Sequence, residues 1–305
     1  MRHMIDKRTG VVLTGLLFVI ASAANAQFGG RPGDVVLFAV TANGGADLLA
    51  VPPTTTNSPQ SLANFKVETS DSVPLSTSAP FGLLRQVFYE QPNELFEVGI
   101  DAENAVGLHR TFLVPTKLFL IQGAFNPIGN FVGNPNIFIS LPQSLDVEGD
   151  ISLEQFKFLI WAPTNWPFIA PTNQRGPVGP PDVPGWLYLF QLPGGLVLPS
   201  LLPWTNLSVL YPNAGWQEGV DLKLLEVDSA LGSTTRLLRL RPGKQTTLFH
   251  IPGHTHLFVL QGSVSITPAG SGTVTLHAND YAFLPENFVV TLSNPQPYEG
   301  PGAAP

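Results

Sequence analysis

The sequence predicts an all-β protein, and three observations carry that prediction. Short apolar runs rich in Val, Ile, Leu and Phe recur along the chain, separated by turn residues. The 305 residues include 30 prolines and 29 glycines, which end regular structure at short intervals. Only 12% of the residues are charged, which is too few for the polar faces of long amphipathic helices. Short strands joined by many turns indicate an all-β fold.

The expected strands are spread over the whole chain. Each is built from β-branched, aromatic or other apolar residues that suit a pleated, half-buried surface. In chain order they cover residues 34–40, 85–89, 95–100, 118–121, 137–139, 187–190, 222–225, 235–240, 258–260, 273–276 and 289–292. One segment has two alternatives: residues 152–155 have the spacing of a helix capping box, whereas residues 155–158 alternate like a strand.

Residues 1–26 have the features of a secretory signal peptide. Three basic residues near the start precede an apolar stretch at 11–24, and Ala24-Asn-Ala26 forms an A-x-A cleavage site. We expect cleavage after Ala26 and a periplasmic or secreted mature protein without a membrane span. The chain has no cysteine near this site, which excludes lipid attachment there.

Charge and cysteine content exclude several classes of protein. The formal net charge is −7, and no cluster of basic residues provides a nucleic-acid surface, so no nucleic-acid partner is expected. The chain contains no cysteine, so it has neither disulfides nor thiolate metal ligands nor a cysteine nucleophile. It also lacks a phosphate loop, a dinucleotide fingerprint and a G-x-S-x-G motif.

A proline-rich segment divides the chain into two expected β domains. Residues 163–205 carry a run of prolines that cannot lie inside a sheet. We therefore expect an N-terminal β domain at 27–162, a connection at 163–205 and a C-terminal domain at 206–300. Residues 118–125 are similar to residues 257–264, and the offset in numbering is 257 − 118 = 139. Either the two domains arose by duplication, or two apolar strands match by chance.

Three of the six histidines, His250, His254 and His256, lie close together around a Pro-Gly turn. Imidazoles placed so close together can converge on one metal ion, and we predict a metal site from these three. The expected ion is Zn, Fe, Mn, Ni or Cu, with a metal-free protein as the equal alternative. Residues 254 and 256 share one face of a strand, so if Thr255 faces a barrel interior, both histidines face outward.

Residues 216–297 resemble the cupin superfamily, and within it the small cupins related to anti-sigma and acetylacetone-cleaving types. The resemblance is carried by Trp216–Val220, Gly232–Gly243, Phe258–Gly262 and Asn279–Pro285, with Asn279 at a family glycine. It implies a double-stranded β-helix, or jelly-roll, barrel for the C-terminal domain. The N-terminal domain would be β-sandwich-like or a second, degenerate cupin. Because cupins often dimerise through the edges of their sheets, the resemblance implies a homodimer.

The resemblance also implies that the family's standard metal ligands are missing. The family uses two histidines and a glutamate in its first motif and a histidine in its second. Counted from Gly262, the glutamate position falls on Thr255, and the second-motif histidine falls on Val290. The first two positions fall on Leu248 and His250, or on Phe249 and Ile251, depending on the family's spacing.

Three functions follow as hypotheses, with no catalytic residue assigned. The first is an exported cupin that binds a small molecule or a metal without turnover. The second is a metal-dependent dioxygenase, isomerase or hydrolase with a rearranged histidine site. The third is a structural protein of the cell exterior. The valine at the second-motif histidine favours binding over catalysis. Glu90, Glu94 and Glu97 are expected on a solvated loop and strand edge.

Overall fold

The computed structural model describes residues 28–42, 60–78, 83–101, 108–111, 114–122, 136–141, 146–149, 156–164, 195–213, 215–251 and 253–297. The predicted signal peptide, the strand expected at 187–190 and most of the proline-rich segment lie outside these residues. Within the described ranges, no helix has the length and apolar character needed to cross a bilayer.

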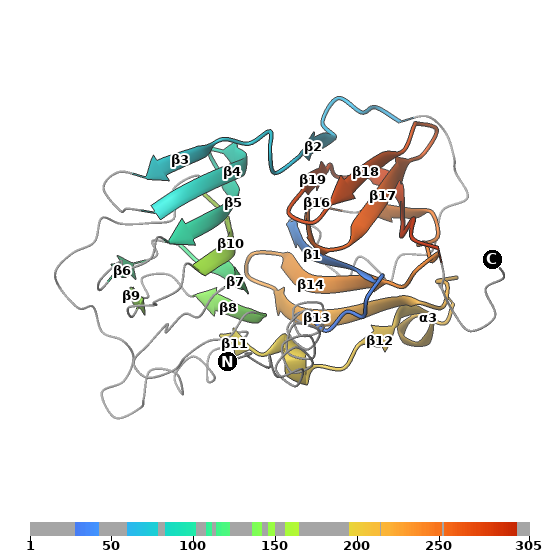
Figure 1. The fold of residues 1–305 in the computed structure, drawn as a ribbon, viewed down its shortest axis with the longest axis horizontal. Helices are drawn as coiled ribbons and strands as arrows, with labels where there is room; N and C mark the ends of the chain where they lie inside the picture. Colours follow the sequence, from blue (N-terminus) through green and yellow to red (C-terminus); the bar gives the residue numbers. More distant parts are fainter. Residues whose placement is uncertain are drawn as a thin grey trace, which may run out of the picture.

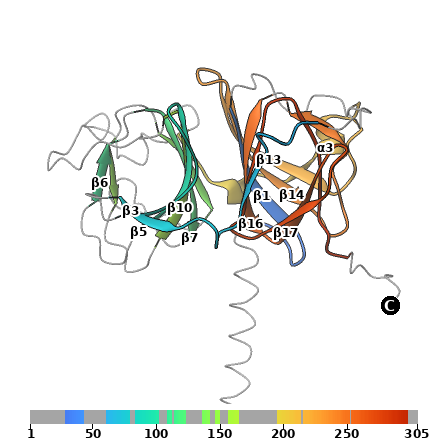
Figure 2. The same ribbon diagram turned by 90° about the horizontal axis from the view of Figure 1, so that it is seen from above.

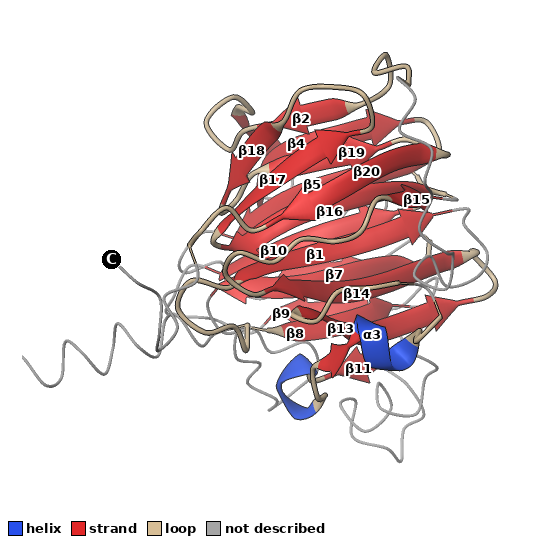
Figure 3. Ribbon diagram, turned by 90° about the vertical axis from the view of Figure 1, so that its right-hand side faces the viewer, coloured by secondary structure: helices blue, strands red, loops and turns tan. Residues whose placement is uncertain are grey.

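The protein is all-β, as predicted, and each expected strand within the described residues overlaps an observed one. The helical turns η2 (Pro199–Leu201) and α3 (Leu207–Leu210) lie at one end of the body of strands (Figure 3). The strands are β1 (Val35–Ala42), β2 (Lys66–Glu68), β3 (Leu75–Ser78), β4 (Leu83–Gln91), β5 (Glu94–Asp101), β6 (Leu108–Thr111), β7 (Thr116–Gln122), β8 (Ile137–Leu141), β9 (Asp146–Gly149), β10 (Phe156–Ala162), β11 (Leu196–Val197), β12 (Thr205–Asn206), β13 (Val220–Asp228), β14 (Ser233–Leu240), β15 (Phe249–Ile251), β16 (His254–Gln261), β17 (Ser263–Pro268), β18 (Val274–His277), β19 (Tyr281–Leu284) and β20 (Phe288–Ser293).

The strands form two barrel-like units that lie side by side (Figures 1 and 2). The C-terminal unit has a seven-stranded sheet, in the order β12-β13-β14-β1-β16-β19-β2, and a four-stranded sheet, β15-β20-β17-β18. The N-terminal unit has a seven-stranded sheet, in the order β3-β4-β5-β10-β7-β8-β11, and the pair β6-β9. Adjacent strands in all four sheets are antiparallel, as expected for a jelly roll.

The two large sheets repeat one order of strands, in which β4 corresponds to β13, β5 to β14 and β7 to β16. The start of β5 at residue 94 and of β14 at residue 233 differ by 233 − 94 = 139, the offset already found between residues 118 and 257. Both the order and the offset support duplication over a chance match. The ambiguous segment before β10 is a strand from Phe156 onward, and residues 152–155 lie outside the described part.

Two strands from the N-terminal part of the chain join the C-terminal sheet, and one from the connection joins the N-terminal sheet. The early strands β1 and β2 join the C-terminal sheet, where β1 lies between β14 and β16 and β2 pairs with β19. The later strands β10 and β11 join the N-terminal sheet, where β10 lies between β5 and β7. The sheets therefore cross the sequence division into 27–162 and 206–300.

The described apolar core has two parts, which follow from strand alternation. One fills the C-terminal barrel and includes Leu257 and Val259 of β16. The other lies between the two large sheets and includes Phe258 of the same strand together with Phe96 and Phe119 of the N-terminal unit. Successive residues of β16 therefore face alternately into the barrel and into the interface between the units.

Candidate metal centre

The family's four ligand positions inside the C-terminal barrel carry no histidine or carboxylate. Thr255, Phe249 and Ile251 line the barrel interior, and Val290 is fully buried in the same core. These positions agree with the spacing from Gly262 that places Phe249 and Ile251 at the two histidine positions. Asn279, at the family glycine, adopts φ 74° as expected for a left-handed turn. These side chains do not fit a metal ion.

The C-terminal barrel is also too full to hold a small molecule. The enclosed space among the lining side chains is about 20 Å³, which is room for about one water molecule. Its polar side chains bond to one another, because Arg236 donates to Thr41 at 2.8 Å and Thr41 lies 2.9 Å from Thr255. A ligand in this barrel was one form of the binding hypothesis, and the packing argues against it.

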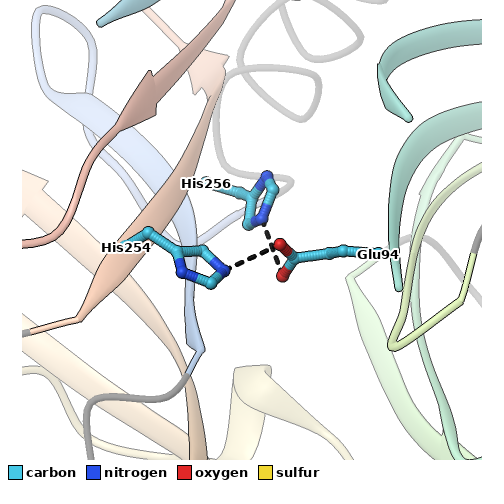
Figure 4. A group of neighbouring side chains, drawn as sticks. All are labelled: Glu94, His254 and His256. Carbon is cyan, nitrogen blue, oxygen red and sulfur yellow. Dashed lines mark ion pairs between the residues drawn. The ribbon is translucent and has the colours of Figure 1, made fainter. Parts of the chain in front are cut away.

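The two outward-facing histidines of β16 meet a carboxylate from the other unit (Figure 4). His254 Nε2 lies 2.7 Å from Glu94 Oε2, and His256 Nε2 lies 3.0 Å from Glu94 Oε1. Glu94 is the first residue of β5, directly after the tight turn that joins β4 to β5. Strand alternation points both histidines away from the barrel, so they reach across the interface.

A shell of aromatic residues holds this group in place. The imidazole of His256 stacks on Phe96 with a centroid distance of 5.2 Å and an interplanar angle of 2°. Its Nδ1 lies 2.8 Å from the hydroxyl of Tyr281, which is fully buried. The indole of Trp161 donates to Glu94 Oε1 at 2.8 Å. Hydrogen bonds of this kind to ligand side chains orient them in metal sites.

Burial and contact set the protonation of the three central groups. Burial acts to raise the pKa of Glu94, but the adjacent imidazoles of His254 and His256 outweigh it and lower this pKa to about 2. Burial lowers the pKa of His256, although Glu94 acts in the opposite direction. Burial raises the pKa of Tyr281 well above its usual range. The group therefore presents an ionised carboxylate, a neutral buried imidazole and a neutral phenol.

The donor atoms are arranged as they would be around a shared cation. One ligand atom each from Glu94, His254 and His256 lies within 4.8 Å of the others. Both Nε2 atoms are buried, and neither makes a hydrogen bond of normal geometry with the described residues. Two imidazole nitrogens and one carboxylate oxygen suit zinc, iron or manganese. The residues present therefore fit a divalent ion.

The structure brings two of the three predicted ligands together and leaves the third elsewhere. His254 and His256 lie side by side on β16, while His250 lies on β15, in the four-stranded sheet, where it pairs with Val289. The side chain of His250 lies outside the described part of the structure.

Glu94 was missed by the sequence analysis, and the expectation that the neighbouring acids are solvated is wrong for two of them. Glu94 is 5% exposed and Glu97 is fully buried. β5 is covered on both faces, and each buried charge has a partner: Glu97 bonds Arg85 across to β4, and Glu94 contacts the two histidines. The signal available was an acidic residue at the start of a strand rich in apolar residues, which does not reveal a partner in the other half of the chain.

Sequence comparison identifies the C-terminal domain. Residues 232–298 match the family model described as an EutQ-like cupin domain. The C-terminal domain is therefore a cupin domain. No curated protein matches the sequence.

Solved structures similar to this cupin share its fold at low identity. A candidate dioxygenase from Nostoc punctiforme PCC 73102 is 14% identical, with a TM-score of 0.55 over 83% of this chain and 89% of that one. An oxalate decarboxylase mutant from Bacillus subtilis is 11% identical, with a TM-score of 0.53 over 78% and 76%. A formate complex of the Lactobacillus farciminis oxalate decarboxylase is 10% identical, with a TM-score of 0.53 over 81% and 86%.

The candidate metal centre of this cupin borders a groove at the edge of the interface. His254 lines the groove, and 18% of its side chain is exposed, whereas the His256 side chain is fully buried. The groove has a volume of about 570 Å³. We call it the interface groove; it is lined by Ala63, Asn64, Phe65, Lys66, Tyr89, Gln91, His254, Phe283, Pro285 and Glu286. Of the three residues of the centre, His254 is the one that lines this groove.

Proposed function

We propose that this cupin binds a divalent transition-metal ion between its two units, through Glu94, His254 and His256. The observation that supports this most directly is the convergence of one carboxylate oxygen and two imidazole nitrogens within 4.8 Å. A metal-binding cupin of this kind keeps the family fold and moves the ligand set from the barrel interior to the interface between barrels. Zinc, iron and manganese suit the donor atoms, and the donor atoms alone do not choose among them.

The burial of the centre supports a bound cation over a plain hydrogen-bonded cluster. An ionised carboxylate removed from water needs a compensating positive charge. Burial lowers the pKa of His256 and so disfavours its imidazolium form. A metal ion supplies the missing charge and uses the Nε2 lone pairs of both histidines.

Metal analysis of matched variants tests this proposal. The purified protein is stripped with chelator, loaded with Zn²⁺ or Co²⁺, desalted and analysed for metal. We expect one ion per chain in the wild type and in Glu90→Gln, whose carboxylate is exposed and lies outside the centre. We expect loss of the ion in Glu94→Gln and His256→Ala, with circular dichroism to check folding. Retention of stoichiometric metal by folded Glu94→Gln, or no metal in the wild type, would refute the proposal.

The interface groove favours a second, narrower candidate function, that of a metal-dependent enzyme. A bound ion of this class polarises a carbonyl or lowers the pKa of a coordinated water. With three protein ligands, a catalytic ion keeps a position open, whereas a structural ion is closed by four. Water-proton relaxation of the Mn²⁺-loaded protein separates the two. An exchangeable inner-sphere water supports an open position, and its absence supports a structural ion.

We also propose that the protein is exported, on the strength of the basic, apolar and A-x-A elements in residues 1–26. N-terminal sequencing of the protein recovered from the periplasm or medium of a bacterial host should begin at Gln27. Recovery of the uncleaved chain in the cytoplasm would contradict export.

A further inference from the structure

The interface groove has the features of a binding site for one class of small molecule, and the inference below rests on the proposed metal at Glu94, His254 and His256. The groove reaches the centre through His254, the ligand that is partly exposed. Its volume of about 570 Å³ lies within the range of small-molecule sites.

The charge of the loaded centre selects a monoanion. A divalent ion held by one carboxylate and two neutral imidazoles keeps a single net positive charge, because Glu94 contributes the one negative charge among the three ligands. In a half-buried site that charge is neutralised best by one anionic oxygen donor. Carboxylate oxygen is a good ligand for zinc, iron and manganese.

The rim of the groove adds no further net charge. Among the described residues that line the groove, Lys66 and Glu286 carry opposite charges. The ammonium of Lys66 is already held by Glu68 at 3.1 Å and by the Phe88 carbonyl at 3.0 Å. The rim therefore does not favour a second carboxylate on the ligand, and the one site of net positive charge is the ion.

The remaining wall of the groove is aromatic. Tyr89 and Phe283 stack with a centroid distance of 4.6 Å, and Phe65 lines the groove beside them while stacking on Phe288 at 5.2 Å. Aromatic surfaces contact planar rings better than they contact puckered or branched groups of the same size. The groove therefore offers a flat apolar surface next to a cationic centre.

We propose that the interface groove binds a planar monocarboxylate, with its carboxylate on the metal ion and its ring against the aromatic wall. Charge selects the single carboxylate, and the wall of Phe65, Tyr89 and Phe283 selects the planar apolar body. The ligand class is thus an aromatic acid of about the size of benzoate.

Three carboxylates that differ in shape test the proposal on the Co²⁺-loaded protein. Benzoate, cyclohexanecarboxylate and acetate are titrated, and the visible d–d absorption of the ion reports entry of a carboxylate into its coordination sphere. We expect benzoate to bind about 2- to 12-fold more tightly than acetate, since one aromatic contact contributes roughly 0.5–1.5 kcal/mol. Cyclohexanecarboxylate should fall between them, because it is apolar but not planar.

Variants outside the ligand set show whether the wall causes the preference. In Phe65→Ala the benzoate preference over acetate should fall at least twofold while the Co²⁺ spectrum and stoichiometry stay unchanged. Leu62→Ala is the matched control: Leu62 is 42% exposed and does not line the groove, and it should keep the wild-type preference.

The outcomes separate this inference from the metal proposal. If Co²⁺ does not bind, both are overturned. If Co²⁺ binds but the three acids bind equally, or if Phe65→Ala keeps the full preference, the metal site stands and the aromatic ligand is overturned. Benzoate that binds equally well to metal-free protein overturns the assignment of its carboxylate to the ion.

Discussion

The interface between the two units has two equivalent ends, and the protein treats them differently. Lys117 on β7 and His256 on β16 hold the same place in the repeated order of strands, and their numbers differ by the repeat offset, 256 − 117 = 139. The strand pairing gives the same correspondence. Lys117 pairs with Trp161 of β10, and His256 pairs with Val40 of β1, the strand that holds the place of β10 in the other large sheet. Both side chains lie between the large sheets and are almost fully buried.

The two ends place different side chains against their carboxylates. At one end the Lys117 ammonium lies 2.7 Å from Glu226 Oε2, 2.7 Å from Asp228 Oδ2 and 2.8 Å from Ser140 Oγ. At the other end the equivalent residue is a histidine, and with His254 it faces the carboxylate of Glu94. Carboxylates cross the interface at both ends, but the chain supplies a permanent cation at the lysine end alone.

This difference shows how a duplicated fold can gain a new site without using its barrel. Buried carboxylates need a compensating cation wherever they lie. A lysine provides a cation that is part of the chain. Histidines instead provide nitrogen lone pairs that can bind an exchangeable metal ion. The interface is therefore one place where the two halves differ in chemistry.

The largest expected change in the free energy of unfolding comes from removing the ammonium of Lys117. Lys117→Met removes the ammonium and leaves the buried Glu226 and the adjacent Asp228 without it. Breaking a buried pair in this way costs about 3–5 kcal/mol of unfolding free energy. Urea denaturation of metal-free protein measures the cost.

Two further variants check that charge causes this loss. Lys244→Met removes a half-buried lysine away from the interface and should cost much less. Adding Glu226→Leu to Lys117→Met should recover part of the stability, because it removes the stranded carboxylate. A double variant as unstable as the sum of its parts would contradict the comparison.

The exchangeable cation should stabilise the other end by mass action. At a free metal concentration 100 times the dissociation constant, a single site adds about 2.7 kcal/mol to the free energy of unfolding. Thermal and urea unfolding with and without Zn²⁺ should show this gain in wild type and in Lys117→Met, and no gain in Glu94→Gln. Equal stabilisation of Glu94→Gln would place the ion elsewhere.

A smaller effect is expected from the residue that orients His256. Tyr281→Phe removes the hydroxyl that lies 2.8 Å from His256 Nδ1. Loss of such a partner costs about 10- to 100-fold in metal affinity. Competition with a chromophoric chelator measures the affinity, and Tyr211→Phe, at a tyrosine outside the centre, serves as control. Unchanged affinity in Tyr281→Phe would show that aromatic packing alone orients the imidazole.

The sequence predicted the all-β class and the strands because these depend on local patterns, and it left duplication and chance as alternatives for the match at 118–125 and 257–264. Strand alternation also predicted that His254 and His256 face outward if Thr255 faces the barrel, and the contacts of these three residues meet that condition. These predictions need the residues of one strand and no distant partner.

The role of Glu94 and the sheet that each strand joins depend on contacts between segments far apart in the chain. Glu94 and His254 belong to different halves of the sequence, and the role of Glu94 follows from the way the two units pack. The place of β1 in the C-terminal sheet was equally hidden, because an apolar strand does not show in its sequence which sheet it joins. Tertiary pairing, not local propensity, decides both.

The smallest expected effect is the pH dependence of the lysine end. Burial acts to raise the pKa of Asp228, but the hydrogen bond from Lys117, the backbone N–H groups of Leu231 and Ala230 and the charge of Lys117 outweigh it and lower this pKa. A carboxyl whose folded pKa lies below its unfolded value of about 3.9 stabilises the protein above about pH 4, and this contribution is lost as the pH falls through the folded pKa. Between about pH 5 and pH 3, metal-free wild type should therefore lose more stability than Asp228→Asn, as measured by urea midpoints. Asp71→Asn, at an exposed aspartate, should follow the wild type. An Asp228→Asn variant with the same acid dependence as wild type would show that Glu226 alone balances Lys117.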